Sequence, residues 1–246
     1  MEDILIFVLA MSKPFAGPRT VAIFMDGNRR WAKVRGLSSI EGHLAGKNVF
    51  LSFLEFYSSV REKWGTENYI FYAFSTENWN RSAEEVAAIM GIFERAFIEF
   101  KEILPRLRKD GIRINFIGER ERLSPRLQSL MKEIEEATKE GGAGVVALAI
   151  SYGGKADILQ AVNRLIRENK TVISAEDIDR TLWTSKMPSL DLVIRPGGEK
   201  RLSNFLTWQS AYSELVFSDT LWPDFTLAEL ERIFGEYATR ERRQGK

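Results

Sequence analysis

Charged and amide side chains gather in one turn that follows the first apolar run of the chain. Asp26 is followed by Gly27, Asn28, Arg29 and Arg30, so a carboxylate and two guanidinium groups share that turn. A carboxylate can hold Mg²⁺, which prefers oxygen ligands and commonly keeps phosphate oxygens in its shell. Arginines and backbone N–H groups at a helix start bind the remaining charge of a diphosphate. The turn alone fits a metal-diphosphate site and an ordinary Asp-Gly turn with solvated arginines equally well.

A second polar cluster follows the next apolar run. Ser75, Asn78 and Arg81 surround Trp79 there. By itself the pattern is weak evidence for a site, because Ser and Asn turns that cap helices are common.

The third cluster is stronger. Arg195, Arg201 and Ser203 bracket a Pro-Gly-Gly turn, whose flexible backbone can close on an oxyanion. Two arginines, a hydroxyl and free N–H groups predict a second diphosphate cradle. Glu214, at the start of the next apolar run, either supplies a further metal oxygen or is a charge at the exposed end of a strand.

The single histidine of the chain, His43, lies at the front of a predicted helix, where histidine more often caps or packs than catalyses. The aromatic residues Trp31, Trp79, Phe205 and Trp208 are, on their own, core or interface residues. Residue type and position alone therefore assign no function to these side chains.

Six apolar runs rich in β-branched and aromatic residues predict strands. They are Val21–Met25, Tyr69–Phe74, Arg113–Ile117, Val145–Ile150, Leu190–Ile194 and Glu214–Phe217. Stretches with a helical period alternate with them and cover Leu44–Tyr57, Ala83–Leu107, Pro125–Lys139, Lys155–Arg167, Ala175–Thr184 and Leu227–Arg243. Ser82 followed by Glu85 predicts a capping box, and Ser174 followed by Asp177 predicts a weaker one.

This alternation predicts an α/β fold, with a central parallel sheet of about six strands covered by helices on both faces. Ligands of such sheets bind beyond the carboxyl ends of the strands. The three polar clusters follow the first, second and fifth predicted strands, so they fall at that edge of the sheet.

Composition narrows the function classes. With 246 residues, 44% of them hydrophobic, the chain can bury a full core, and we expect one domain over residues 1–246. The 35 basic and 34 acidic residues create no global field that would draw the protein to nucleic acid or to an anionic membrane. The absence of cysteine excludes disulfides and thiolate metal sites and suits a reducing compartment.

The N-terminal run Ile4–Met11 is apolar but far shorter than the roughly 20 residues that span a bilayer. The acidic residues Glu2 and Asp3 before it disfavour a signal peptide. We interpret residues 1–18 as a peripheral segment that packs on the body or rests on a membrane surface.

Two anion cradles and one or two carboxylates suggest an enzyme that joins two diphosphate substrates. A nucleotide phosphotransferase needs similar parts. Neither a Walker-type phosphate loop nor a G-x-G-x-x-G follows any predicted strand, which argues mildly against a nucleotide. The residues alone leave both classes open.

The sequence blocks themselves resemble the cis-prenyltransferase family, of the undecaprenyl diphosphate synthase type. The matching blocks are VAIFMDGNRRWA, EGHLAG, YAFSTENWNR with the downstream Glu84-Glu85, DLVIRPGGEKRLSNFLTWQSAYSEL and LWPDF, in the family's order. The resemblance runs from about Val21 to the C-terminal Arg-Arg-Gln-Gly. It implies a cytoplasmic homodimer in which each subunit has a parallel sheet and a hydrophobic tunnel, with peripheral membrane contact.

The activity implied by the resemblance is repeated condensation of isopentenyl diphosphate onto an allylic primer, farnesyl or geranylgeranyl diphosphate. The product would be a long-chain cis-polyprenyl diphosphate, the precursor of a glycosyl carrier lipid, and the cofactor would be Mg²⁺. Accessory subunits without activity also occur in the family, but they would show damage at Asp26, Asn78, Arg81 or Arg201, and all four are intact.

Matched positions imply the site residues. Asp26 and Asn78 would be catalytic, and Asp26 and Glu214 would hold the metal. The substrate-binding residues would be Gly27, Asn28, Arg29, Arg30, Trp31, His43, Ser75, Trp79, Arg81, Arg195, Arg201, Ser203, Arg243 and Gly245. The tunnel lining would include Phe93, Phe97 and Ile98, for which ordinary core packing is equally open.

The sequence departs from the family pattern near the allylic site. Arg29 stands where many bacterial relatives have glycine, and Ser39 stands where an arginine that helps bind the allylic head group is expected. Our hypothesis is that Arg29 or Arg35 restores the missing charge.

Overall fold

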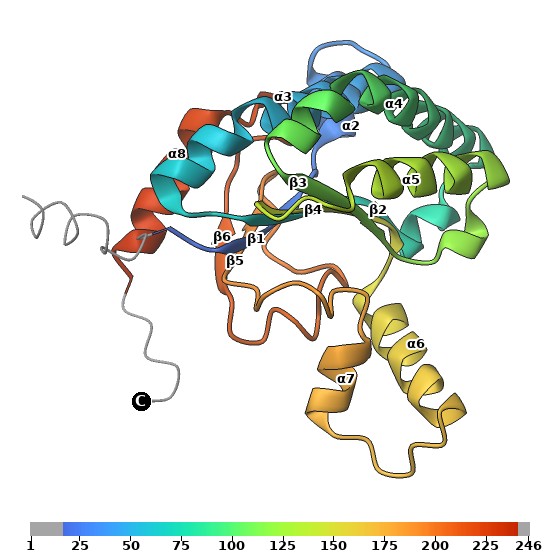
Figure 1. Cartoon of the computed structure of the whole chain (residues 1–246). Helices are drawn as coiled ribbons and strands as arrows, with labels where there is room; N and C mark the ends of the chain where they lie inside the picture. Colours follow the sequence, from blue (N-terminus) through green and yellow to red (C-terminus); the bar gives the residue numbers. More distant parts are fainter. Residues whose placement is uncertain (1–16, 241–246) are drawn as a thin grey trace, which may run out of the picture.

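The computed structural model of the chain describes residues 17–240 (Figure 1). The apolar run Ile4–Met11 lies outside the described residues, and so do Arg243 and Gly245. The predictions made for these parts of the chain therefore stay predictions.

Six parallel strands form the central sheet. They are β1 (Thr20–Phe24), β2 (Asn68–Ser75), β3 (Ile112–Ile117), β4 (Gly144–Tyr152), β5 (Leu192–Arg195) and β6 (Glu214–Phe217). Their order across the sheet is β3-β4-β2-β1-β5-β6, and every pairing is parallel. The predicted sheet is confirmed, and each strand ends within two residues of its predicted limits.

The strand order creates a topological switch point between β1 and β5. The chain leaves β1 toward β2 on one side, whereas it leaves β5 toward β6 on the other side. Two connections that part in opposite directions open a crevice at the carboxyl ends of the two strands, where ligands of such sheets bind. Asp26 follows β1 and Arg195 ends β5, so both lie at this crevice.

The helices are α2 (Asn28–Val34), α3 (Ser39–Trp64), α4 (Ala83–Lys109), α5 (Pro125–Thr138), α6 (Gly154–Arg167), α7 (Ala175–Thr181) and α8 (Leu227–Ala238). α3 is longer than predicted at both ends. It begins at a capping box between Ser38 and Glu41 and stops at Gly65, which adopts a left-handed conformation with φ 74°. The polar first and last turns of α3 do not follow the apolar period, which marks only its middle.

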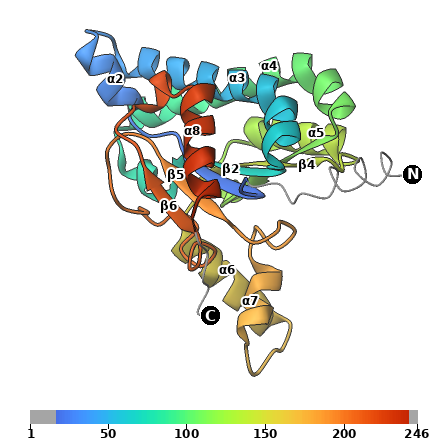
Figure 2. The same cartoon turned by 90° about the vertical axis from the view of Figure 1, so that its left-hand side faces the viewer.

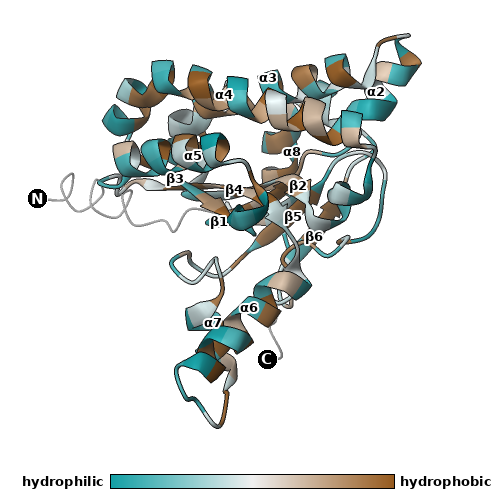
Figure 3. Cartoon of the chain, turned by 90° about the vertical axis from the view of Figure 1, so that its right-hand side faces the viewer, coloured by the Kyte–Doolittle hydropathy of each residue, from teal (hydrophilic) through white to brown (hydrophobic). Residues whose placement is uncertain are grey.

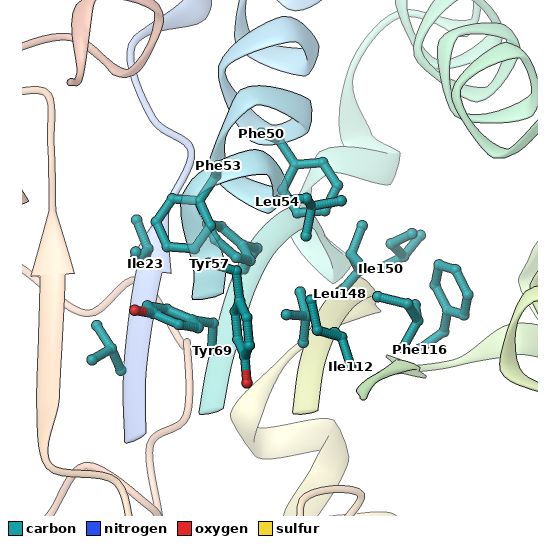
Figure 4. Close-up of a cluster of buried hydrophobic side chains, with 14 of the residues drawn as sticks. Ile23, Phe50, Phe53, Leu54, Tyr57, Tyr69, Ile112, Phe116, Leu148 and Ile150 are labelled. Atoms are coloured by element: carbon teal, nitrogen blue, oxygen red, sulfur yellow. The ribbon is translucent and has the colours of Figure 1, made fainter. Parts of the chain in front are cut away.

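α3, α4, α5 and α8 cover one face of the sheet (Figures 1 and 2). Aromatic rings fill the space between these helices and the strands, as Figure 4 shows for part of the cluster. The ring of Phe71 on β2 packs edge to face against Phe50 and Phe53 of α3, with centroids 5.0 and 4.9 Å apart. Burial of such large side chains is the main stabilising term of this layer.

The opposite face of the sheet differs from the prediction of a second helical layer. The segment after α7 covers it in irregular conformation, with Leu190, Phe205 and Leu206 buried against the strands. The strands present small alanines on this face, Ala22 and Ala147 among them, which lets a loop approach closely. α6 and α7 project away from the sheet and pack on each other (Figure 1).

Of the two predicted capping boxes, the one expected to be weaker is complete and the one expected to be stronger is incomplete. Ser174 and Asp177 form the complete reciprocal box at α7. At α4, Ser82 accepts a hydrogen bond from the backbone N–H of Glu85, but the Glu85 side chain does not return to the cap. It pairs with Arg81 instead, because the nearby guanidinium attracts the carboxylate more strongly than a backbone N–H does.

In the part of the chain that the structure describes, residues 17–240, no helix combines the length and the apolar character needed to cross a membrane.

Candidate active site

Asp26 and Arg195 meet at the switch point between β1 and β5. Arg195 Nη2 donates to Asp26 Oδ2 at 2.9 Å, and Arg195 Nη1 donates to Ser203 Oγ at 2.8 Å and to the carbonyl of Arg201. The Arg195 guanidinium also lies 4.5 Å from the centre of the Phe24 ring. Since Arg195 is only 4% exposed, it positions Asp26 and Ser203 rigidly relative to each other.

Two pockets open beside this ion pair and share a wall. The first has a volume of about 730 Å³ and the second about 590 Å³. Both are lined by Met25, Asp26, Asn28, His43 and Arg81. The first also contains Arg29, Arg30, Lys33, Leu37, Ser38 and Ser39, and the second also contains Ser75, Asn78, Arg195, Arg201 and Ser203. The fold therefore brings all three polar clusters to one place.

The Glu85 carboxylate organises the cationic side of both pockets. Glu85 Oε1 accepts from Arg81 Nη1 at 2.9 Å and lies 3.4 Å from Arg29 Nη1. His43 Nε2 approaches the same oxygen to 3.9 Å. One carboxylate thus holds two arginines near the shared wall. Sequence reasoning noted Glu85 as a cap residue and as part of a matching block but assigned it no role in the site, although its i, i+4 spacing from Arg81 is a usable signal.

His43 is an uncharged imidazole near neutral pH. Burial, together with the positive charges of Arg81 and Arg29 and against the opposing effect of Glu85, lowers its pKa to about 4. Its Nε2 atom is buried and has no hydrogen-bond partner among the described residues. An unsatisfied buried nitrogen at the shared wall of two pockets is available to a ligand.

The second cluster is a reciprocal cap on the short helix η1 (Thr76–Asn80). Ser75 Oγ accepts from the backbone N–H of Asn78, and Asn78 Oδ1 accepts from the backbone N–H of Ser75 at 3.1 Å. The Trp79 indole turns away from the pockets and donates to Ser151 Oγ at 2.9 Å. Trp79 therefore fixes η1 on β4, and Arg81 is the member of this cluster whose cation faces both pockets.

The turn after Asp26 has strict steric demands. Gly27 has φ 100°, and a Cβ atom there would lie 2.8 Å from Leu221 Cδ2. Asn28 Nδ2 donates to the Met25 carbonyl at 3.3 Å, while its Oδ1 is buried against Gly46 of α3. The Trp31 indole donates to Asp224 at 2.7 Å on the outer side of α2. These three positions shape the turn, and Trp31 is absent from the residues that line the two pockets.

Arg201 and Ser203 come from the loop after β5. Arg201 pairs with Glu199 at 2.5 Å, and Arg30 Nη1 lies 3.8 Å from the same glutamate. Ser203 has φ 45°, an uncommon left-handed conformation for a serine that the bond from Arg195 helps to hold.

Glu214 does not join Asp26 within one subunit, so its role as a metal ligand stays a prediction. Glu214 is in register with Leu192, and Leu192 is in register with Val21. Asp26 lies five residues beyond Val21, or about 16 Å along the strand direction at 3.3 Å per residue. The Glu214 carboxylate pairs instead with Arg240 at 2.5 Å.

The residues near Asp26 fit a magnesium ion that is brought in with a diphosphate. Asp26 Oδ2 is held by Arg195, whereas Asp26 Oδ1 lies 3.7 Å from Arg30 Nη2, and the Asp26 side chain is 33% exposed. Mg²⁺ commonly takes one or two carboxylates and completes its shell with phosphate oxygens and water. In residues 17–240, no group of three or more acidic or histidine side chains could hold a metal without such a ligand.

The residues predicted to line a tunnel differ in burial. Phe97 is buried in the core and stacks on Phe93, with ring centroids 6.1 Å apart. Ile98 is 45% exposed and lines neither pocket, so its place in a tunnel stays a prediction. The apolar wall of the second pocket comes from Phe24, Tyr72, Ala73, Phe74 and Ile89.

Sequence reasoning missed two charged pocket residues. Lys33 lies one helical turn after Arg29 on α2 and lines the first pocket. Glu77 lines the second pocket and accepts from Asn204 Nδ2 at 2.8 Å. The i, i+4 spacing of Arg29 and Lys33 places both cations on one helix face and could have revealed Lys33.

Comparison with known proteins agrees with this geometry. A family model described as putative undecaprenyl diphosphate synthase matches residues 24–245. A ditrans,polycis-undecaprenyl-diphosphate synthase of Pseudomonas aeruginosa, named as specific for (2E,6E)-farnesyl diphosphate, is 43% identical over 235 residues. That match covers 93% of this chain and 91% of the relative. The chain belongs to the undecaprenyl diphosphate synthase family of prenyltransferases.

Two solved structures share the fold. Lavandulyl diphosphate synthase from Lavandula x intermedia, in complex with dimethylallyl diphosphate, superposes with a TM-score of 0.86 at 33% identity and covers 94% of this chain and 99% of its own. A probable undecaprenyl diphosphate synthase from Campylobacter jejuni gives a TM-score of 0.76 at 34% identity, with coverage of 93% and 99%.

Proposed function

We propose that this chain acts as a single cis-prenyltransferase domain that adds isopentenyl diphosphate repeatedly to an allylic diphosphate primer. The product is a long-chain cis-polyprenyl diphosphate of the undecaprenyl type, the precursor of a glycosyl carrier lipid. The observation that carries the proposal is the meeting of two cation-lined pockets at Asp26, because the reaction needs two diphosphates bound side by side. The name of the Pseudomonas aeruginosa relative favours farnesyl over geranylgeranyl diphosphate as the primer.

The first pocket takes the allylic head group in this proposal. Arg29, Arg30 and Lys33 supply positive charge there, and Ser38 and Ser39 supply hydroxyl donors. Isopentenyl diphosphate occupies the second pocket, with its head group at Arg201, Ser203 and the backbone near Arg195. Its hydrocarbon part and the growing tail meet the apolar wall at Phe24 and Phe74.

The reaction breaks the bond between the allylic carbon and its diphosphate oxygen. Arg29 and Arg30 of the first pocket stabilise the negative charge of the departing diphosphate while the allylic carbon becomes cationic. The double bond of isopentenyl diphosphate supplies the electron pair for the new carbon–carbon bond, and loss of a proton leaves a cis double bond. Asp26 would hold Mg²⁺, which adds positive charge at the diphosphate when it is bound. Asn78 holds η1, and thereby Arg81, at the reacting groups.

A homodimer completes the proposal. α6 and α7 project from the body; α6 exposes Leu159 and Ile166, and the connection between the two helices exposes Val172. Apolar side chains gathered on a projecting helix pair favour burial against a second subunit. Glu214 lies on the edge strand β6, away from Asp26 of its own subunit, so it would serve only a metal site formed between subunits. Arg243 and Gly245 would complete the substrate site of the neighbouring subunit. We place the enzyme in the cytoplasm, with peripheral membrane contact.

Equilibrium binding of both substrates to the same subunit tests the proposal. The probes are isopentenyl diphosphate and farnesyl thiolodiphosphate, an allylic analogue that reacts slowly, with Mg²⁺ present. We expect each probe to bind one site per subunit in the presence of the other, and Arg81→Ala to weaken both. Arg126→Ala is the matched control, because this exposed arginine pairs with Glu94 and lines neither pocket. Mutual exclusion of the probes, or tighter binding of a nucleoside triphosphate, would favour the phosphotransferase class.

A further inference from the structure

Three large apolar side chains are exposed at one projecting corner of the molecule. Val34 is 72% exposed at the end of α2, Leu37 is 38% exposed in the following turn, and Ile40 is 46% exposed at the start of α3. They are three of the nine exposed large hydrophobic residues in the described part of the chain, and they fall within seven consecutive positions. Figures 2 and 3 show that α2 and this turn form an outer corner above the sheet.

The same corner is basic. The segment 27–40 contains Arg29, Arg30, Lys33 and Arg35 and no acidic residue. The three arginines face carboxylates from other elements, namely Glu85, Asp26, Glu199 and Asp224. Among residues 17–240, Lys33 has no carboxylate within ion-pair distance. The corner therefore combines exposed apolar groups with cations at least partly open to solvent.

The corner also borders the candidate active site. Lys33, Leu37, Ser38 and Ser39 line the first pocket, so one side of the corner faces solvent and the other faces the proposed allylic site. Val34 and Ile40 do not line either pocket. An amphiphile that leaves the first pocket would pass the apolar groups of this corner.

We propose that this corner, formed by Val34, Leu37 and Ile40 with the basic residues around them, is the surface that rests on an anionic lipid bilayer. The inference rests on the proposed function, because it gives the polyprenyl product a direct route into lipid. Side chains of this kind on a protruding turn insert into the interface between head groups and acyl chains, and lysine and arginine add attraction to anionic lipids. A second protein copy fits the corner less well, since a stable interface buries about 800 Å² on each partner and three side chains on a convex turn do not provide it.

Vesicle flotation tests the proposal with the full chain. The vesicles contain either phosphatidylcholine alone or an equal mixture with phosphatidylglycerol, at low and at moderate salt. We expect binding to the anionic vesicles that weakens with salt, and we expect Val34→Ser/Ile40→Ser to reduce the bound fraction about tenfold. The matched control is Ile98→Ser, which removes an exposed apolar side chain on α4, away from both the corner and the proposed subunit interface, and should retain binding.

Parallel measurements make the result decisive. Thermal unfolding and sedimentation must show that Val34→Ser/Ile40→Ser keeps its fold and oligomeric state, and activity on a soluble primer in detergent should be unchanged. Failure of the proposed function would appear as missing product in every variant, independently of flotation. The docking proposal is overturned if the wild type does not bind anionic vesicles, or if the double variant binds as well as wild type. It is also overturned if binding is lost only on Phe7→Ser/Leu9→Ser, or if the corner variant changes the oligomeric state.

Discussion

The Asp26 carboxylate and the Arg195 guanidinium are joined at 2.9 Å across the switch point of the sheet. Asp26 follows the end of β1 and Arg195 closes β5, so two strand ends adjacent in the sheet supply the pair. The same guanidinium donates to Ser203, so Arg195 links Asp26 and Ser203 at the pockets. Because Arg195 is buried and already bonded to protein groups, we assign it a positioning role toward Asp26.

Replacement of Arg195 by lysine should lower kcat at least tenfold and change the KM values for both diphosphates less. A single ammonium cannot reach Asp26 and Ser203 together in the planar geometry of a guanidinium. Steady-state kinetics with each diphosphate varied separately measure the split between kcat and KM. An unchanged kcat would show that the position of Asp26 does not depend on this ion pair.

Arg29 and Arg35 should differ in their effect on the allylic substrate. Arg29 lines the first pocket, whereas Arg35 stacks on Trp31 at 4.4 Å and pairs with Asp224 at 3.0 Å outside it. Arg29→Gly should therefore raise the KM for the allylic diphosphate about tenfold, the value of one charge-assisted hydrogen bond. Arg35→Ala should leave it within about twofold. The structure therefore favours Arg29 over Arg35 as the residue that restores the charge missing at Ser39. Equal effects of the two variants on the KM would contradict this assignment.

His43 should make the folded state sensitive to acid. Its pKa is lowered to about 4 by burial and by Arg81 and Arg29, whereas an unfolded histidine titrates near 6.5. Between these pH values the unfolded chain binds a proton that the folded chain does not, so stability falls as pH decreases from 6.5 toward 4. The loss amounts to about 3 kcal/mol at most. Urea unfolding of wild type and His43→Gln over this range measures it, and parallel curves for the two proteins would refute the assignment.

The aromatic layer under α3 should dominate stability. Phe71 is fully buried, so Phe71→Ala should cost about 3–5 kcal/mol of unfolding free energy through lost burial and a cavity. Ile98→Ala on the exposed side of α4 should cost less than about 0.5 kcal/mol. Chemical denaturation at neutral pH compares the two variants. A loss from Ile98→Ala as large as that from Phe71→Ala would show that Ile98 is buried in solution.

The sequence predicted the sheet well because inner strands such as β1 and β5 are buried on both faces and read as continuous apolar runs, as in Val21, Ala22 and Ile23. It also placed the three clusters at one edge, since parallel strands share the direction of their carboxyl ends. The irregular cover of the second face was not predictable from periodicity. It depends on small residues such as Ala147, which allow a loop to replace a helix.

Individual site roles were harder to predict, because they depend on where side chains point. Trp31 and Trp79 belong to the matching motifs, yet their indoles bond Asp224 and Ser151 outside the pockets. Glu214 looked like a metal ligand from its residue type, but register places it at the opposite end of the strands from Asp26. Which of these residues reach the pockets depends on contacts between distant parts of the chain, and a local sequence pattern does not encode such contacts.

The most direct test of the central claim is product formation from isotopically labelled isopentenyl diphosphate and farnesyl diphosphate with Mg²⁺, read by chromatography and mass spectrometry. Wild-type protein should yield long-chain polyprenyl diphosphates with new cis double bonds, and Asp26→Ala should lower the rate at least about a thousandfold while keeping the fold. A protein that makes no elongated product with farnesyl or geranylgeranyl diphosphate, or an Asp26→Ala variant as active as wild type, would contradict the account.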